Sequence, residues 1–230
     1  MIDKLIKHNV STSDVELLKN YNSREGFKIL DGEESNDMED HFSEYPIFEN
    51  IIAVLTDENS NYWCLYIKGP MKGMVCYLNH DETNLEPKFI SLSSFLNTIE
   101  NNPELEDFYD IHPDLFDFPT SIQREDFKER KNIIEELQKD FDVENDEEVK
   151  QQMAFAIMAL CTTNEIEESI YPFLNDEDMY IQERAIQMIG FHNYKPAKEK
   201  LTELRETAMH NGKQAIDLSL IHISEPTRPY

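Results

Sequence analysis

Residues 61–82, NYWCLYIKGPMKGMVCYLNHDE, contain within a short span the residue types needed for nucleophilic catalysis. Cys64 and Cys76 offer thiols, His80 an imidazole base and Asp81 a carboxylate that could orient it. The spacing argues against this arrangement, because Cys76 and His80 are four residues apart in a strand-like segment. Their Cα atoms would then be about 13 Å apart, which is beyond hydrogen-bond reach. We therefore expect Cys76 to lie in the core.

Disulfide and metal sites are the other chemistry that these residue types allow. Cys64 and Cys76 could face each other across a hairpin, but three cysteines cannot all pair and free thiols are expected. His41, His112 and His192 are scattered, with no paired-histidine spacing that would bind zinc. Nucleotide-binding glycine motifs and the GxSxG motif are absent from the sequence. We therefore predict a non-enzymatic protein with no catalytic residue, no metal and no cofactor.

The net charge restricts the partners of the chain. Its 230 residues carry a formal charge of -26, and acids outnumber bases in both halves. This charge opposes binding to nucleic acid or anionic membrane and favours salt-sensitive association with a basic protein. The simpler interpretation is that acidity keeps the protein soluble. Without a signal-like N-terminus or a run of about 18 apolar residues, we expect a cytoplasmic protein.

The elements that must position residues 61–82 form a β-rich region. Strands are predicted at about 47–56, 61–68 and 73–79 from their β-branched and aromatic residues. Residues 57–61, DENSN, and 69–73, GPMKG, have the composition of turns. Apolar or aromatic residues occupy both alternating positions of the runs. The pattern predicts an antiparallel meander that is covered on both faces.

The segments around this meander give further predictions. Residues 31–46 are acidic and poor in apolar residues, so we expect a loop. Residues 89–99 predict the end of a strand followed by a helix that Ser93 or Ser94 caps. Residues 103–120 mix acids, aromatics and prolines, which indicates an irregular linker between two halves.

The second half, 121–217, has helical periodicity. Helices are predicted at 121–141, 146–162, 164–174, 177–191 and 194–210. Acids at the helix starts, as in 146–148 and 176–178, are expected to act as caps. One apolar pattern recurs 32 residues later, at Val149, Met153 and Ile157 and then at Ile181, Ala185 and Ile189. A period near 30 with two helices per unit predicts an α-solenoid, and a globular helical bundle is the alternative.

Two segments resemble known families. Residues 45–100 resemble the SUKH superfamily of Smi/Knr-like domains, although the family's Leu-Pro-x-x-Tyr segment is represented only by Tyr45-Pro46. The motif positions are Gly73, Val75, His80, Asp81, Ser94, Phe95 and Leu96. This resemblance implies an α+β domain over 1–102, with an antiparallel sheet and flanking helices. Residues 121–217 resemble HEAT-like helical repeats.

The last thirteen residues, 218–230 (LSLIHISEPTRPY), fit neither half. They resemble a translated sequencing-library adapter, so we predict a non-native tail that follows a truncated repeat domain. A native β-like tail is the alternative. We also expect this segment to interrupt the helix that contains Ala215 and Ile216.

The SUKH resemblance implies a function. In bacteria these domains are mostly thought to be immunity proteins that bind and neutralise toxins, many of which are nucleases. The chain is thus predicted to bind a basic toxin directly, and an intracellular scaffold or regulatory adaptor using the helical-repeat surface is the alternative. We expect contacts from exposed acidic turns with aromatic anchors. The candidates are Asp57, Glu58, Tyr62, Tyr66, Asp81 and Glu82.

Overall fold

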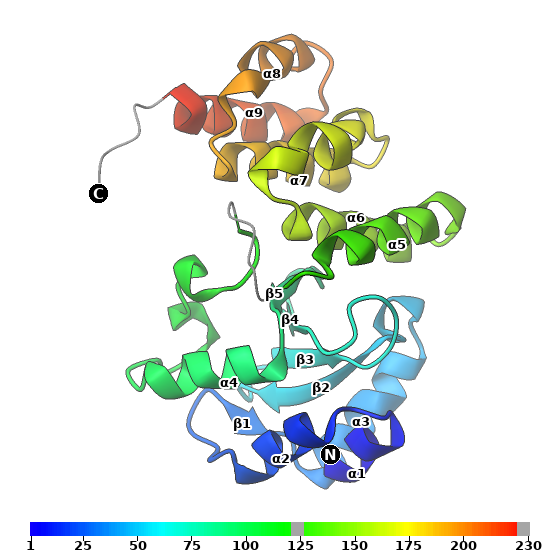
Figure 1. Cartoon of the computed structure of the whole chain (residues 1–230), viewed down its shortest axis with the longest axis vertical. Helices are drawn as coiled ribbons and strands as arrows, with labels where there is room; N and C mark the ends of the chain where they lie inside the picture. The colour runs from blue at the N-terminus through cyan, green and yellow to red at the C-terminus, as the bar shows by residue number, and fades with distance from the viewer. Residues whose placement is uncertain (121–126, 225–230) are drawn as a thin grey trace. The chain divides into compact units, whose positions relative to one another are not determined.

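The computed structural model describes residues 1–120 and 127–224 (Figure 1). The chain divides into two compact units, Met1–Phe118 and Pro119–Tyr230, and each is described by itself. The first unit contains α1 (Ile2–Lys7), α2 (Thr12–Asn20), β1 (Lys28–Ile29), α3 (Gly32–Ser43), a 3-10 turn η1 (Pro46–Phe48), β2 (Ile51–Thr56), β3 (Tyr62–Tyr66), β4 (Val75–Leu78), β5 (Pro87–Phe89) and α4 (Leu92–Asn101). The second contains α5 (Arg130–Val143), α6 (Glu147–Leu160), α7 (Met179–Phe191), α8 (Lys198–Leu204) and α9 (His210–Ser224).

The first unit is built on a five-stranded antiparallel sheet in the order β1-β2-β3-β4-β5. Strands β2, β3 and β4 fall inside the three predicted runs, and helices accompany the sheet, so the α+β class is confirmed. Trp63 pairs with Tyr77 across β3 and β4, and Cys64 pairs with Cys76. Side chains alternate between the two faces of a strand, so these two pairs lie on opposite faces.

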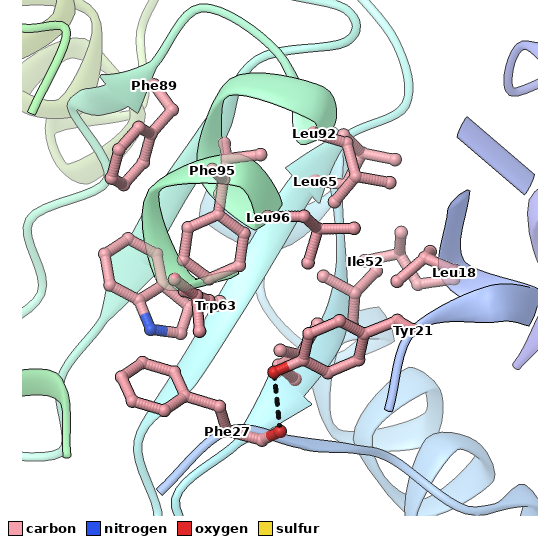
Figure 2. Close-up of a cluster of buried hydrophobic side chains, with 14 of the residues drawn as sticks. Leu18, Tyr21, Phe27, Ile52, Trp63, Leu65, Phe89, Leu92, Phe95 and Leu96 are labelled. Carbon is pink, nitrogen blue, oxygen red and sulfur yellow. Dashed lines mark hydrogen bonds between the residues drawn. The ribbon is translucent and has the colours of Figure 1, made fainter. Parts of the chain in front are cut away.

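The core of this unit is formed by residues of the sheet together with residues of α1, α2 and α4. Figure 2 shows Phe95 and Leu96 pointing from α4 toward the strands, with Phe95 beside Trp63. The ring centres of Trp63 and Phe95 are 4.5 Å apart, and both side chains are almost fully buried. Ser91 caps α4, rather than Ser93 or Ser94, by accepting a hydrogen bond from the Ser94 N–H at 3.1 Å.

Residues 31–46 correct one prediction, because most of this segment is helix α3 and not a loop. Asp31 caps the helix through hydrogen bonds from the Glu33 and Glu34 N–H groups, and the Glu34 carboxylate accepts from the Asp31 N–H. This is a capping box, and acids in the first turn also interact favourably with the helix dipole. Ser35 and Phe42, seven residues apart, are the buried positions of the helix.

Residues 103–118 correct a second prediction, because they belong to the first unit and do not form a linker. Leu105, Phe108 and Ile111 join the main core, where the Phe108 ring lies edge-on to Trp63 at 5.3 Å. Two 3-10 turns, Phe108–Asp110 and Pro113–Leu115, carry the chain through this region. These buried apolar side chains follow no regular periodicity along the sequence, and their packing in the core holds the segment in place.

The second unit is helical, as predicted. Asp146 and Asp178 cap α6 and α7 by accepting backbone N–H bonds, which confirms the prediction that these acids act as caps. Residues 121–126 of the first predicted helix lie outside the described residues, and α5 begins at Arg130. In place of the helix predicted at 164–174, short 3-10 and π turns cover Thr163–Asn175.

Several contacts in this unit join residues about one repeat period apart. The Gln138 amide donates to the Ser169 hydroxyl, 31 residues on. The Ser219 hydroxyl donates to the Ile186 carbonyl, 33 residues earlier, at 3.0 Å. Helix α7 packs against both α6 and α9. Contacts between successive helices occur both in stacked repeats and in a globular helical bundle, so the α-solenoid stays a prediction.

Helix α9 corrects the prediction of an interruption after Asp217, since it continues to Ser224. Ser219 and Ile223 are four residues apart and both buried, so residues 218–224 continue the buried face of the helix. Gly190 allows this close packing, because a Cβ there would lie 2.5 Å from the Ser219 Oγ. The non-native origin of 218–230 stays a prediction, and residues 225–230 lie outside the described residues.

The buried His192 predicts acid sensitivity of the second unit. Burial lowers its pKa to about 4 from an ordinary value of 6.5, and Glu165 opposes this shift only in part. The part of the free energy of unfolding that depends on neutral His192 is therefore fully present above pH 6.5. As the pH falls toward 4, at most about 3 kcal/mol of it is lost. Urea unfolding between pH 7 and 4 measures this loss, which His192→Gln should reduce. An unchanged pH profile in His192→Gln would contradict the assignment.

Candidate functional site

The turn between β2 and β3 is organised around Asp57. One carboxylate oxygen, Oδ1, accepts hydrogen bonds from the N–H groups of Asn59 at 2.7 Å and Asn61 at 3.3 Å. The other, Oδ2, accepts from the Asn61 side-chain amide at 2.7 Å. Glu58 and Ser60 adopt positive φ angles in this turn. Asp57 therefore uses both oxygens to hold the turn and is itself 8% exposed.

Asn61 connects this turn to the segment that follows β4. Its side-chain oxygen accepts from the His80 N–H at 3.1 Å and lies 2.8 Å from the His80 Nδ1. Because an amide oxygen only accepts, the hydrogen-bond network assigns a proton to Nδ1. The other ring nitrogen, Nε2, lies 3.2 Å from the Asp81 carboxylate. Two turns far apart in sequence are thus fixed to each other through one buried asparagine.

The cysteine and histidine of the opening motif are not brought together as a catalytic pair. Cys76 is fully buried opposite Cys64, whereas the His80 side chain is 46% exposed and bonded to Asn61. Burial, followed by the neighbouring Cys76, raises the pKa of the Cys64 thiol well above its ordinary value. A raised pKa disfavours the thiolate that a nucleophile needs. All three cysteines are free and buried, as expected.

The predicted contact residues divide into two groups. Glu58, Asp81 and Glu82 are exposed. Tyr62 is half-buried and pairs in register with Thr56 and Leu78, which precede the segments that contain these acids. Asp57 is not an exposed contact, because the turn uses its carboxylate.

Tyr66 is the second correction among the contact residues. It is 6% exposed, and its hydroxyl donates to the Leu85 carbonyl at 2.6 Å. Burial is the main cause that raises its pKa. The segment that contains Leu85 covers this face of the sheet, so Tyr66 serves the fold as a buried residue.

The electrostatic surroundings of the exposed acids are uneven. Glu58 forms an ion pair with Lys28 of β1, which offsets its charge. Burial and then the nearby Glu34 carboxylate raise the pKa of Tyr62. Glu34 was not among the predicted contacts, because its segment was predicted to be a loop. The capping-box pattern of Asp31 and Glu34 was the signal that could have identified it.

Asn61→Ala tests whether this frame is held by the asparagine. We expect a loss of about 1–3 kcal/mol in the free energy of unfolding, because both the Asp57 carboxylate and the His80 N–H lose a buried partner. Chemical denaturation measures the loss. Asn59→Ala is the matched control, since its exposed side chain makes one 3.3 Å contact, and it should cost less than about 0.5 kcal/mol. Equal losses in both variants would contradict the role of Asn61.

Within residues 1–120 and 127–224, no group of three or more His, Cys, Asp or Glu side chains could hold a metal ion. None of the helices in that part of the chain combines the length and the apolar character that a membrane-spanning segment needs. Comparisons with protein-family models, with curated proteins and with solved structures found no match for this chain.

Proposed function

We propose that the protein is a binding protein that engages a basic partner through the acidic end of its sheet. The observation that carries this proposal is the Asn61 network, which joins His80, the residue before Asp81 and Glu82, to the turn that presents Glu58. Charges on a rigid frame lose little conformational entropy on association. The formal charge of -26 would speed encounter with a basic surface.

The partner class follows from the family resemblance and the charge together. We propose a SUKH-like first unit joined to a HEAT-like second unit, acting as an immunity protein against a basic toxin. A nuclease toxin must expose a basic surface to bind its polyanionic substrate. An acidic protein that covers this surface blocks the substrate without performing chemistry.

The proposal predicts a toxin gene adjacent to this one, and co-expression with any toxin so encoded tests it. We expect growth to be rescued and the purified proteins to form a complex that weakens as salt rises. Asp81→Lys with Glu82→Lys should weaken the complex at least about tenfold. Glu104→Lys with Glu106→Lys is the matched control, because it changes the net charge equally at exposed residues outside the network. Failure to rescue growth and to form a complex would contradict the proposal.

A scaffold role for the second unit is the alternative, and exposed apolar residues favour it. Tyr180 and Phe191 of α7 are 50% and 51% exposed. If a complex forms but survives the Asp81 and Glu82 reversals and is lost in Tyr180→Asp, the helical unit carries the binding surface. Loss in the first pair of variants alone assigns binding to the sheet.

A further inference from the structure

A pocket of about 220 Å³ lies in the first unit, away from the residues of the Asn61 network. It opens between α3, the start of β2 and the residues that follow β3. Its apolar walls come from Met38, Phe42, Phe48, Ile52, Ala53 and Ile67. The rings of Phe42 and Phe48 lie 4.7 Å apart and only 30° from parallel, which gives the pocket an aromatic wall. A cavity of about 150 Å³ accommodates benzene, so this one suits a somewhat larger apolar body.

Ser35 places an unsatisfied polar group in this apolar setting. The residue is 3% exposed and lines the pocket. Its hydroxyl has no hydrogen-bond partner among the described residues. A buried hydroxyl without a partner is costly and rare in folded proteins. Its presence on a pocket wall is explained if a ligand supplies the missing partner.

Basic groups lie at this pocket in an otherwise acidic protein. His8 and Lys68 line the pocket, and the Lys4 ammonium donates to the carbonyl of the pocket-lining Ser35 at 2.6 Å. Burial is the main cause that lowers the pKa of His8, and the next is the nearby Lys7; Lys68 and Lys4 act in the same direction.

Two carboxylates face these basic groups. Glu39 lies 2.7 Å from the Lys4 ammonium and 3.8 Å from that of Lys7, and Glu49 lies 3.3 Å from Lys68. Lys4 and Lys7 do not line the pocket but contact Glu39, which lines it together with Glu49 and Lys68. Counted together, three lysines face two glutamates, so one negative charge on a ligand would balance this group of charges.

We propose that the pocket binds a small monocarboxylic acid with an aromatic or compact apolar body. The apolar body lies against Phe42 and Phe48, and the carboxylate accepts the Ser35 hydroxyl hydrogen on the side of the pocket that His8 and Lys68 line. Complementary shape acts on the apolar body of the ligand, and hydrogen bonding and charge act on its carboxylate. This site is independent of the proposed toxin-binding surface.

Titration of the whole chain with 3-phenylpropionate, followed by amide NMR shifts, tests the proposal. For a ligand of this size we expect a Kd between about 0.1 and 1 mM. The neutral probe 3-phenylpropanol has the same apolar body and should bind at least about tenfold more weakly, because it lacks the charge. Octanoate and benzoate report how much apolar volume the pocket accepts.

Three variants locate the site. Ser35→Ala should weaken 3-phenylpropionate about tenfold while leaving the unliganded protein equally or more stable, because an unsatisfied hydroxyl is removed. Lys68→Gln should weaken it at least about threefold, and the matched control Lys72→Gln, an exposed lysine outside the pocket lining, should not. Met38→Trp should abolish binding by filling the pocket from a half-exposed position.

The outcomes are distinguishable. Saturable binding that depends on the carboxylate, Ser35 and Lys68 supports the proposal. Equal binding of 3-phenylpropanol overturns the ligand class, and no saturable binding of any carboxylate up to about 10 mM overturns the site. If Met38→Trp fails to fold, Ser35→Ala still decides, since unchanged affinity in that variant contradicts the proposed contact.

Discussion

Trp63→Ala is expected to lower the free energy of unfolding of the first unit by about 3–5 kcal/mol. The residue is 1% exposed and lies within ring contact of aromatics from three separate segments, so no neighbour can fill the space. Its ring centre is 4.9 Å from Tyr77, 4.5 Å from Phe95 and 5.3 Å from Phe108. A loss of this size approaches the whole stability of a small domain.

Urea unfolding followed by far-UV circular dichroism measures the effect, since Trp63 is the single tryptophan and its fluorescence is lost with it. Trp63→Phe should cost less than half as much. It keeps a ring in the cluster, and the indole N–H has no hydrogen-bond partner among the described residues to lose. Phe191→Ala is the control for deletion of a ring at a 51% exposed position and should cost less than about 0.5 kcal/mol. A small loss in Trp63→Ala would contradict a core centred on this residue.

The local sequence pattern correctly predicted those elements for which a single feature, such as strand alternation or a capping acid, determines the structure. Alternating aromatic and β-branched residues located β2, β3 and β4, and acids before apolar runs located the caps of α6 and α7. In each case the residues that form the pattern also make the packing contacts or hydrogen bonds of the element.

The incorrect predictions concern segments whose structure is determined by tertiary contacts. Helix α3 was not predicted because the apolar residues of its buried face are few among many acids. Residues 103–118 have no periodicity, and their place in the core depends on Trp63 and Tyr77 from distant strands.

The site residues show the same limit. Asp57 was predicted to be exposed from its position in a turn, but its carboxylate folds back onto that turn. Asn61 was not identified, because its role depends on His80 being adjacent in space. Spacing along the sequence predicted that Cys76 and His80 form no catalytic pair, and in the structure Cys76 is buried in β4, whereas His80 lies beyond the end of that strand and is bonded to Asn61.

Glu165→Ala is expected to cost the second unit about 3–5 kcal/mol, because it leaves the Arg130 guanidinium buried without its carboxylate. Arg130 is 3% exposed. Its Nη1 lies 2.5 Å from Glu165 Oε2, and its Nη2 lies 2.8 Å from Oε1. It also donates to the Leu160 carbonyl at 2.8 Å, at the C-terminal end of α6 where a cation interacts favourably with the helix dipole.

The Glu165 carboxylate has partners on both sides. The Thr162 N–H and hydroxyl each donate to it at 2.9 Å, which closes the turn after α6. Burial alone would raise the pKa of Glu165, but the hydrogen bonds from Arg130 and Thr162 outweigh it and lower the pKa. The stability from this lowered pKa is present above the unfolded pKa of a glutamate, and it is lost as the pH falls through the folded pKa.

A double-mutant cycle separates the interaction energy between Arg130 and Glu165 from the free-energy cost of burying each charge. Lys131→Gln is the matched control, because Lys131 is 65% exposed and lies 3.8 Å from Glu165, and it should cost less than about 0.5 kcal/mol. Arg130→Met with Glu165→Met should cost less than Glu165→Ala alone, since no charge then remains buried. Denaturant unfolding of the wild type, Arg130→Met, Glu165→Met and the double variant gives the coupling energy. If the double variant is destabilised by the sum of the two single losses, the residues do not act as a pair, and the turn after α6 is held by Thr162 and the surrounding packing instead.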